Sequence, residues 1–546
     1  MKHIPIGVEN FKELIDKKYY YVDKTLFISD VMKEKVVLYA RPRRFGKTLN
    51  MSMLYYFFSI KQKENSYLFH HLHIAKDKNI LQHQNQYPVI FITMKDMKNN
   101  SFDKQQAMFS LLIQEIIRSN QELLTSDRIN EIDKEQLISL YRRTQSDIDL
   151  QNALKFISEC LKQHYQNNVI ILIDEYDVPL QSAFLNNYYD EMVDFLSNVF
   201  SAALKTNDAL EKGILTGCLK IAKESIFTGL NNFNVYSISD KQSNTGFGFT
   251  PDETSRLLED YAVKSYENIV KEWYDGYLFG EQELYNPWSV LKYVQKIKQG
   301  DDRPESFWAN TSGNEIIYRY IKKANSQMRN DFDILTAGGI IEKSIKNNLT
   351  YREMDQINNI YSFLLYTGYL KAITCTDEDK AMYQLMIPNK EINRIYTLIF
   401  EEWFHEQIEM KSTAFVDALM KEDVETANEI LNTILFKSIS YFDYDEKFYH
   451  GVLVGMLSDY QIMSNQEAGI GRSDIAVLPS YKKKRGLVLE LKVAPKEETV
   501  EKTAQTACHQ IKTMKYVEGL HEKGYTDIVG YGIAFYKKSC VIMLLN

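Results

Sequence analysis

The sequence predicts an α/β fold with a parallel-sheet core, followed by a second α/β domain with strands of its own. Short aliphatic runs at residues 36–40 and 169–173 are typical of buried parallel strands. Residues 471–479 and 485–493 favour two further strands joined by a short basic loop. Helical stretches separate the N-terminal runs, as a doubly wound sheet requires.

Length and composition exclude several classes of protein. The 546 residues leave room for roughly three to four domains. Hydrophobic residues at 45% and charged residues at 25% are ordinary globular values and argue against disorder. No apolar run approaches about 18 residues, so no membrane span is expected, and the N-terminal segment lacks an apolar signal core.

Charge and cysteine usage bear on compartment and partners. The 5 cysteines are scattered with no CxxC pair, which excludes a cysteine zinc module and predicts reduced thiols in the cytoplasm. The net charge of −8 is not typical of a nucleic-acid-binding protein as a whole. A local basic groove stays open, because phosphate contacts need only a few well-placed cations.

The segment RPRRFGKT, residues 41–48, lies between the first predicted strand and a helix with a broad apolar face. Strand, loop and helix in this order form the context of a P-loop, GxxxxGK[ST], although Arg41 stands where the first glycine is expected. The glycine lets the backbone approach phosphate, the lysine neutralises β- and γ-phosphate oxygens, and the threonine holds Mg²⁺. The expected nucleotide ligands are therefore Arg43, Arg44, Gly46, Lys47 and Thr48.

The strand at residues 169–173 ends in adjacent carboxylates. Asp174 is expected to reach Mg²⁺ through water, and Glu175 to orient the attacking water. A buried strand that merely ends in a polar turn is the alternative, and the upstream GKT favours an NTPase core. Further strands are predicted at residues 88–94, 213–217 and 234–239, and Thr216 is a candidate sensor of the γ-phosphate.

Blocks along nearly the whole chain resemble bacterial AAA-ATPase-like proteins that carry a C-terminal PD-(D/E)XK nuclease-like domain. They include IPIGVENFKELI, RPRRFGKT, LIDEYDVPL, TGCLKIAKESIFTGLNN, WYDGY, YNPWSV, TGYL and IPNKEI. In that family the loop is itself RPRRFGK[ST], so Arg41 fits the family pattern. The resemblance implies ATP binding and hydrolysis, and a P-loop NTPase core over residues 1–245.

The resemblance also implies a helical lid and connecting region over residues 246–400 and a nuclease-like domain over residues 401–546. Within the lid, WYDGY and YNPWSV are expected to be aromatic turns that pack between lid and core, and not a base-stacking platform. Residues 316–379 are expected to be a charged, helical connection.

The C-terminal strands can be paired from the sequence alone. An antiparallel hairpin that pairs Pro479 with Arg485 places Asp474 directly opposite Glu490, with Lys492 on the same face. Two such carboxylates repel each other unless a divalent cation lies between them, so Mg²⁺ is expected there with the Leu491 carbonyl as a further ligand. Lys492 would orient a water or stabilise charge on phosphate. The alternative is a buried Glu–Lys ion pair.

These residues match the PD-(D/E)XK pattern, with Asp474 as the first Asp and residues 490–492 as (D/E)XK. The family pattern implies a Gln and a Tyr on the next helix, here Gln510 and Tyr516. A further carboxylate often comes from the first helix of the domain. That helix offers His450 at the inward position instead, with Glu446 one turn earlier, and Glu467 is a substitute.

Two function hypotheses follow. The first is an ATP-dependent nuclease that uses Mg²⁺, or Mn²⁺ at the nuclease site, to cut DNA or RNA, with DNA favoured. The second is an ATP-driven regulatory or nucleic-acid-binding protein whose nuclease fold is inactive; a non-enzymatic scaffold conflicts with both carboxylate sites. A homo-oligomer stays open, since the candidate arginine fingers are only Arg43, Arg44 and Arg472.

Overall fold

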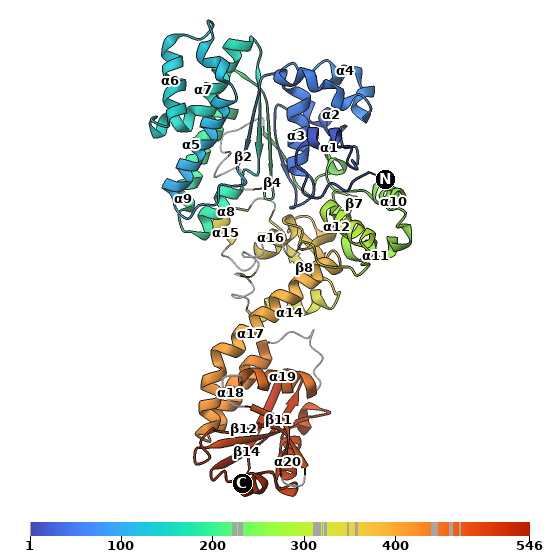
Figure 1. Ribbon diagram of the computed structural model, residues 1–546, viewed down its shortest axis with the longest axis vertical. Coiled ribbons are helices and arrows are strands. Elements are labelled where there is room, and N and C mark those ends of the chain that lie inside the picture. Colours follow the sequence, from blue (N-terminus) through green and yellow to red (C-terminus); the bar gives the residue numbers. More distant parts are fainter. Residues whose placement is uncertain are drawn as a thin grey trace. The chain divides into compact units, whose positions relative to one another are not determined.

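The computed structural model describes residues 2–220, 227, 233–308, 318, 320, 325–346, 349–354, 359–437, 446–457, 462–468 and 471–545 (Figure 1). The chain divides into two compact units. The first comprises Met1–Asn314 with Ile340–Asn393, and the second comprises Glu315–Gly339 with Arg394–Asn546. None of the described helices has the length and apolar character needed to cross a membrane.

A parallel sheet forms the core of the first unit, in the strand order β2-β3-β4-β1-β5. Its strands are β1 (Val36–Ala40), β2 (Val89–Thr93), β3 (Val169–Asp174), β4 (Leu210–Gly217) and β5 (Phe233–Tyr236). The predicted α/β class with a parallel core is confirmed. The last strand ends earlier than predicted, because the Asp240 carboxylate accepts the Ser237 N–H at 2.6 Å and turns the chain.

Helices cover both faces of this sheet (Figure 1). One face carries α5 (Phe102–Arg118), α7 (Asp147–Tyr165) and α9 (Tyr189–Leu204), with α6 (Glu131–Arg142) beside them and α8 (Val178–Leu185) following β3. The other face carries α1 (Phe11–Asp16), α2 (Phe27–Met32) and α3 (Lys47–Phe58). Strand β4 lies between β1 and β3, so any contact between the ends of β1 and β3 must pass over the end of β4.

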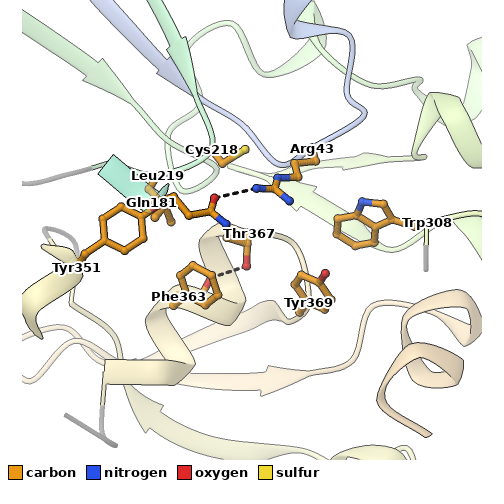
Figure 2. Close-up of a pocket in the computed structure, with 9 residues that line it drawn as sticks. All are labelled: Arg43, Gln181, Cys218, Leu219, Trp308, Tyr351, Phe363, Thr367 and Tyr369. Carbon is orange, nitrogen blue, oxygen red and sulfur yellow. Dashed lines mark hydrogen bonds between the residues drawn. The ribbon is translucent and has the colours of Figure 1, made fainter. Parts of the chain in front are cut away.

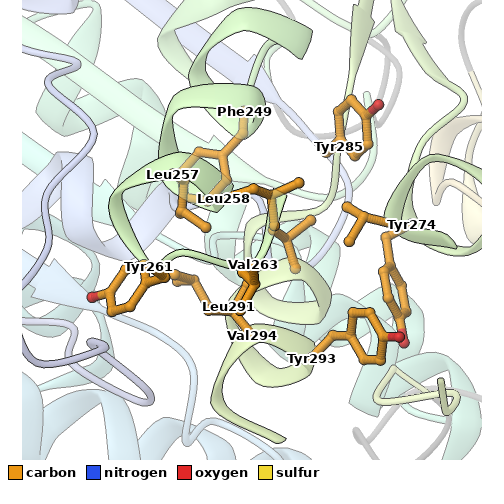
Figure 3. Packing of buried hydrophobic residues seen from close by; sticks show 12 residues of the cluster. Phe249, Leu257, Leu258, Tyr261, Val263, Tyr274, Tyr285, Leu291, Tyr293 and Val294 are labelled. Atoms are coloured by element: carbon orange, nitrogen blue, oxygen red, sulfur yellow. The ribbon is translucent and has the colours of Figure 1, made fainter. Parts of the chain in front are cut away.

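The lid follows as α10 (Pro251–Asp260), α11 (Glu267–Tyr274), β6 (Tyr277–Phe279), β7 (Gln282–Leu284) and α12 (Pro287–Lys298). Tyr274 and Tyr285 lie in the buried hydrophobic cluster of the lid itself (Figure 3). Tyr277 of WYDGY packs against Phe45 of the P-loop, with ring centroids 5.0 Å apart, which is the predicted packing between lid and core. The prediction that these aromatic blocks are turns is corrected by the structure. WYDGY ends α11 and begins β6, and YNPWSV begins α12, because the Asn286 side chain caps Trp288 N and Ser289 N.

The connecting region is not wholly helical, which corrects the prediction for residues 316–379. It contains α15 (Tyr351–Met354), α16 (Ile360–Tyr366) and an antiparallel sheet of order β8-β10-β9, with β8 (Ile341–Ser344), β9 (Lys371–Asp377) and β10 (Met382–Met386). The physical reason is local: β9 carries Ile373, Thr374 and Thr376, and β-branched side chains favour strands. Because the whole stretch of residues 316–379 has a composition that favours helices, the short strand within it was not predicted.

The second unit is a mixed sheet of order β11-β12-β13-β14-β15 with helices around it. Its strands are β11 (Ile462–Ala468), β12 (Gly471–Val477), β13 (Gly486–Val493), β14 (Ile528–Tyr536) and β15 (Ser539–Leu544). Its helices are α14 (Ser326–Thr336), α17 (Lys390–Met420, here from residue 394), α18 (Val424–Lys437), α19 (Glu446–Met456), α20 (Val500–Thr513) and α21 (Tyr516–Glu522). Strands β13 and β14 are parallel, and the other neighbours are antiparallel.

The predicted register of the C-terminal hairpin is confirmed. Ile475 pairs with Leu489 and Val477 pairs with Leu487, which is the alignment that brings Asp474 opposite Glu490. Helix α20 covers the face of the sheet that these residues share, and Ile511 packs there with Val488. The register therefore points the predicted carboxylates toward α20.

Gly532 of β14 brings α20 close to the sheet. It pairs with Glu490 of β13, and a Cβ added at Gly532 would lie 2.5 Å from the Ala504 carbonyl oxygen and 2.6 Å from the Cys508 nitrogen. Both atoms belong to the backbone of α20 and cannot rotate away. Substitution Gly532→Ala should therefore lower the free energy of unfolding by about 1–3 kcal/mol, measured by denaturant unfolding.

A matched substitution separates this clash from the general effect of Gly→Ala. Gly451 lies inside α19, and no described atom comes within 4 Å of a Cβ built there. Gly451→Ala should be neutral or stabilising, because alanine favours a helix over glycine. Equal destabilisation by the two substitutions would contradict the close approach of α20.

Candidate nucleotide site and metal centre

The loop between β1 and α3 has the backbone of an anion-binding turn. Gly46 has a φ of +88° and Arg44 a φ of +67°, so both residues have left-handed backbone. Gly46 is the N-cap of α3 and gives no side-chain cap, which leaves the first N–H groups of the helix for a ligand. No described atom lies within 4 Å of a Cβ built on Gly46. The loop therefore fits a phosphate group.

Lys47 is buried at the start of α3 and holds the loop together. Its Nζ donates to the carbonyl oxygens of Arg41 and Pro42, each at 3.0 Å, and lies 3.5 Å from the Cys218 Sγ. The ammonium group is thus enclosed by the loop and by the end of β4. A phosphate bound at the loop would supply stronger, charged acceptors than these carbonyls.

Thr48 and Asp174, the predicted Mg²⁺ ligands, are in direct contact, although Thr48 lies in the helix that follows β1, Asp174 ends β3, and β4 lies between these two strands. Thr48 Oγ1 donates to Asp174 Oδ2 at 2.8 Å, and the buried Thr216 hydroxyl donates to Asp174 Oδ1. Burial raises the pKa of Asp174, which a bound cation would offset. Thr216, the candidate phosphate sensor, uses its hydroxyl on this carboxylate.

Glu175 follows Asp174 at the end of β3 with a φ of +54°. Left-handed backbone is strained for a residue with a Cβ, and such strain is concentrated at functional sites. The backbone turn at Glu175 separates its carboxylate from that of Asp174. The Asp174 carboxylate accepts hydrogen bonds from the Thr48 and Thr216 hydroxyls. Glu175 is partly exposed at the carboxyl edge of the sheet.

Asp177 is a site residue that the sequence analysis missed. Its Oδ2 accepts the backbone N–H groups of Cys218 at 2.9 Å and Leu219 at 3.1 Å, which fixes the segment after β4 beside Lys47. Burial raises the pKa of Asp177, while the positive charge of Lys47 acts in the opposite direction. The sequence could have indicated Asp177, because it is the third carboxylate of the DEYD segment at residues 174–177.

Arg41 is a structural residue and does not face the loop as a phosphate ligand. Its guanidinium is fully buried and donates to the carbonyl oxygens of Tyr236 at 2.7 Å and Gln242 at 3.2 Å. It also lies 5.3 Å from the ring centroids of both Phe247 and Phe279. Burial lowers the pKa of Arg41 to about 10. Arg41 thus joins the end of β1 to the segments that follow β5.

The next two arginines have different surroundings. Arg43 Nη2 donates to the Gln181 Oε1 of α8 at 2.8 Å. Arg44 is exposed, and its guanidinium lies 4.4 Å from the ring centroid of Trp288 at the start of α12. The structure therefore places Arg43 against α8 and Arg44 against the lid.

The second site lies on the face of the C-terminal sheet that α20 covers. Asp474 Oδ2 accepts the Leu491 N–H at 2.8 Å. Glu490 is buried, its Oε1 accepts a hydrogen bond from Gln510 Nε2, and its Oε2 has no partner in the described structure. Lys492 follows on the same face of β13 and is partly exposed.

The pKa of Glu490 is strongly changed by its surroundings. Burial, with a further contribution from the Asp474 charge, raises the pKa of Glu490 to about 7. Neither oxygen of Glu490 is hydrogen-bonded to Lys492 in the described structure, although the positive charge of Lys492 lowers the pKa of Glu490 and so opposes the effect of burial. An unpartnered buried oxygen beside a second carboxylate fits a divalent cation.

The remaining predicted residues surround this pair. His450 of α19 places Nε2 3.3 Å from the Asp474 carbonyl oxygen, and Glu446 is exposed at the start of the same helix. Tyr516 is buried at the start of α21. The side chains of Glu467 and Arg472 lie outside the described residues. Among the described side chains, no group of 3 or more His, Cys, Asp or Glu residues is placed to hold a metal.

The fold and the P-loop define the first unit as a nucleoside-triphosphatase-type protein, and the hairpin defines a nuclease-type sheet in the second. Residues 5–227 match the family described as predicted AAA-ATPase, and residues 444–544 match the PD-(D/E)XK nuclease superfamily. The two matches together give the chain the architecture of an AAA-ATPase-like segment followed by a PD-(D/E)XK nuclease superfamily segment.

A curated relative is the "Uncharacterized protein in vnfD 5'region" of Azotobacter chroococcum mcd 1. It is 26% identical to this chain over 301 residues, which cover 54% of this chain and 52% of the relative. The chain thus spans about half the length of the curated relative that it matches.

Proposed function

We propose that the protein binds and hydrolyses ATP in its first unit and cleaves a phosphodiester bond of DNA, or of RNA, with Mg²⁺ or Mn²⁺ in its second. The observation that carries the nuclease proposal is the buried, unpartnered Oε2 of Glu490 beside Asp474. Such an oxygen is costly unless a cation or a proton occupies it. The ATP proposal is supported by the contact between Thr48 and Asp174.

In the ATP site, the residues at the P-loop and at the end of β3 would bind the nucleotide and the cation from the positions that they have in the structure. Lys47 and the free N–H groups at the start of α3 would hold the β- and γ-phosphates. Thr48 and Asp174 would hold Mg²⁺, which supplies charge neutralisation when bound. Glu175 would accept a proton from the attacking water at the carboxyl edge of the sheet.

In the nuclease site Asp474, Glu490 and the Leu491 carbonyl would hold the cation. When bound, the cation supplies Lewis-acid activation of the scissile phosphate. Gln510 fixes the orientation of Glu490 through Oε1 and leaves Oε2 for the cation. Lys492, on the same face, would orient a water or stabilise the charge that develops on phosphate.

A second candidate function is regulation by an inactive nuclease fold. The observation that favours it is His450, which lies against Asp474 where active nucleases often supply a further carboxylate. With one carboxylate fewer, the site would bind the cation more weakly. The protein would then respond to ATP and bind nucleic acid without cutting it.

One experiment separates the two functions. The protein is incubated with single- and double-stranded DNA and RNA, with and without ATP, in Mg²⁺ or Mn²⁺, and the products are separated on a gel. Cleavage that requires the cation supports the nuclease. Binding without cleavage in every condition favours the regulatory function.

A separate measurement of molecular size, with and without ATP, tests whether identical chains assemble into an oligomer.

Binding of the cation should depend on pH. A carboxyl whose pKa is raised to about 7 holds its proton near neutral pH, and a cation must displace that proton. The affinity for Mn²⁺ should therefore rise as the pH increases from 6 to 8, about 10-fold per unit below the pKa and little above it. Titration calorimetry at several pH values measures this, and an affinity independent of pH would contradict it.

A further inference from the structure

A pocket lies beside the P-loop, and all of its walls belong to the first unit (Figure 2). Its volume is about 350 Å³, including the mouth. Figure 2 shows Arg43 reaching into the pocket from the loop and Gln181 meeting it from α8, with Trp308 and Tyr369 on the far side. The mechanism proposed above gives Gln181 no role.

Two cationic side chains converge at the end of β4 beside this pocket. Cys218 lines the pocket together with Arg43, and its Sγ lies 3.5 Å from the Lys47 Nζ. The backbone at Cys218 is fixed, because its N–H donates to Asp177. The outermost phosphate of a nucleotide held by Lys47 would lie in this corner, with Arg43 as the second cation.

Arg43 currently bonds to an acceptor that a phosphate can replace. The Gln181 amide oxygen is neutral and accepts from Arg43 Nη2 at 2.8 Å. Hydrogen bonds from a guanidinium to an anionic phosphate oxygen are stronger than those to a neutral amide. A γ-phosphate would therefore attract Arg43 away from Gln181, whereas a nucleoside diphosphate has no γ-phosphate to do so.

We propose that Arg43 and Gln181 form a sensor that distinguishes a nucleoside triphosphate from a diphosphate. Gln181 holds Arg43 when the γ-phosphate is absent, and Arg43 binds the γ-phosphate when it is present. Gln181 is thus a positioning residue that sets the free-energy difference between ATP and ADP binding. The inference rests on the proposed ATP function and adds the group that reads the γ-phosphate.

The sensor acts within one chain. Gly368, in the turn after α16, has a φ of +88°, and a Cβ built there would lie 3.1 Å from Pro42 of the P-loop and 3.3 Å from Trp308. Trp308 in turn stacks on Tyr369, with ring centroids 4.9 Å apart. The chain's own residues therefore line the pocket on this side of Arg43, and the sensor uses no residue of a second chain.

Affinities for ATP and ADP, measured with the full chain, test the sensor. Arg43→Ala should weaken ATP binding by about 10-fold or more and leave ADP binding within about 2-fold. Gln181→Glu replaces the neutral acceptor with a carboxylate, which holds Arg43 more tightly and should weaken ATP binding selectively. Gln181→Met keeps the volume without the acceptor, so ATP should bind as well as in the parent or more tightly.

The two substitutions Gln181→Glu and Gln181→Met distinguish a sensing role of Gln181 from a purely structural one. If Gln181 only supported the fold, both substitutions would lower the melting temperature and change ATP and ADP affinity together. That result, or an unchanged ratio of ATP to ADP affinity in Arg43→Ala, overturns the sensor. Opposite effects of Gln181→Glu and Gln181→Met on ATP affinity support it.

Lys47→Ala distinguishes failure of the sensor from failure of the proposed function. If Lys47→Ala binds ATP like the parent, the ATP site is wrong and the sensor falls with it. If Lys47→Ala loses both nucleotides and Arg43→Ala discriminates normally, only the sensor is wrong. A mixture of the Arg43→Ala and Lys47→Ala proteins should show the sum of their separate ATPase rates, and a higher rate would overturn action within one chain.

Discussion

Glu490→Ala should abolish binding of Mg²⁺ and Mn²⁺ to the second unit and any nucleic-acid cleavage, while ATP hydrolysis continues at the parent rate. The reason is that Glu490 supplies the buried oxygen without a partner and Asp474 already accepts the Leu491 N–H. A single remaining carboxylate is a poor site for a divalent cation. Titration with Mn²⁺, a cleavage assay and an ATPase assay measure the three effects.

Lys492→Ala is the matched control on the same strand face. It should leave cation binding intact and lower the cleavage rate by about 10²-fold or more, if Lys492 stabilises charge in the transition state. Melting curves with and without Mg²⁺ complete the test. A parent protein that gains no stability from either cation would contradict the metal site and favour the inactive fold.

Glu490 also predicts how stability changes in the absence of metal. Its pKa is raised to about 7 in the folded protein, so between its ordinary value and pH 7 the folded state binds more protons than the unfolded state. This contribution to stability is present at low pH and is lost as the pH rises through 7. Glu490→Gln should remove that part of the pH dependence, as seen in melting curves between pH 5 and pH 8.

The sequence was sufficient where short-range rules govern the structure. The C-terminal hairpin has one register that places its apolar side chains in the core, and a one-residue shift would turn every side chain to the other face. Asp474 and Glu490 follow from that register. The P-loop is equally local, because Gly46 and Lys47 lie where a strand meets a helix.

The features that the sequence did not predict depend on contacts between distant segments. Arg41 looked like a replaced glycine of the P-loop, and its role depends on Phe247 and Phe279, which follow about 200 residues later. Gln181 has no motif, and it becomes important only because α8 brings it to Arg43. The sheet of β8, β9 and β10 was missed because short, partly exposed strands give a weak periodic signal.

Lys47→Ala should abolish detectable ATP binding and hydrolysis, the largest effect expected in the first unit. Charged hydrogen bonds to phosphate contribute about 1.5–3 kcal/mol each, and the buried ammonium group of Lys47 stands at the centre of the loop. Isothermal titration with ATP and a phosphate-release assay measure the two losses. Lys298→Ala, which removes an exposed lysine at the end of α12, should change neither.

The substitution Lys47→Ala also removes the bonds to the carbonyls of Arg41 and Pro42, so loss of ATP binding alone does not separate chemistry from loop structure. Glu175→Gln resolves this ambiguity. Glu175 has no part in these loop bonds, and its carboxylate is assigned to the attacking water, so the variant should bind ATP with parent affinity and hydrolyse it about 10²-fold or more slowly. Parent rates in both Lys47→Ala and Glu175→Gln would show that ATP is hydrolysed elsewhere. Slow hydrolysis with intact binding in Glu175→Gln alone would assign the proton transfer to the residue that ends β3.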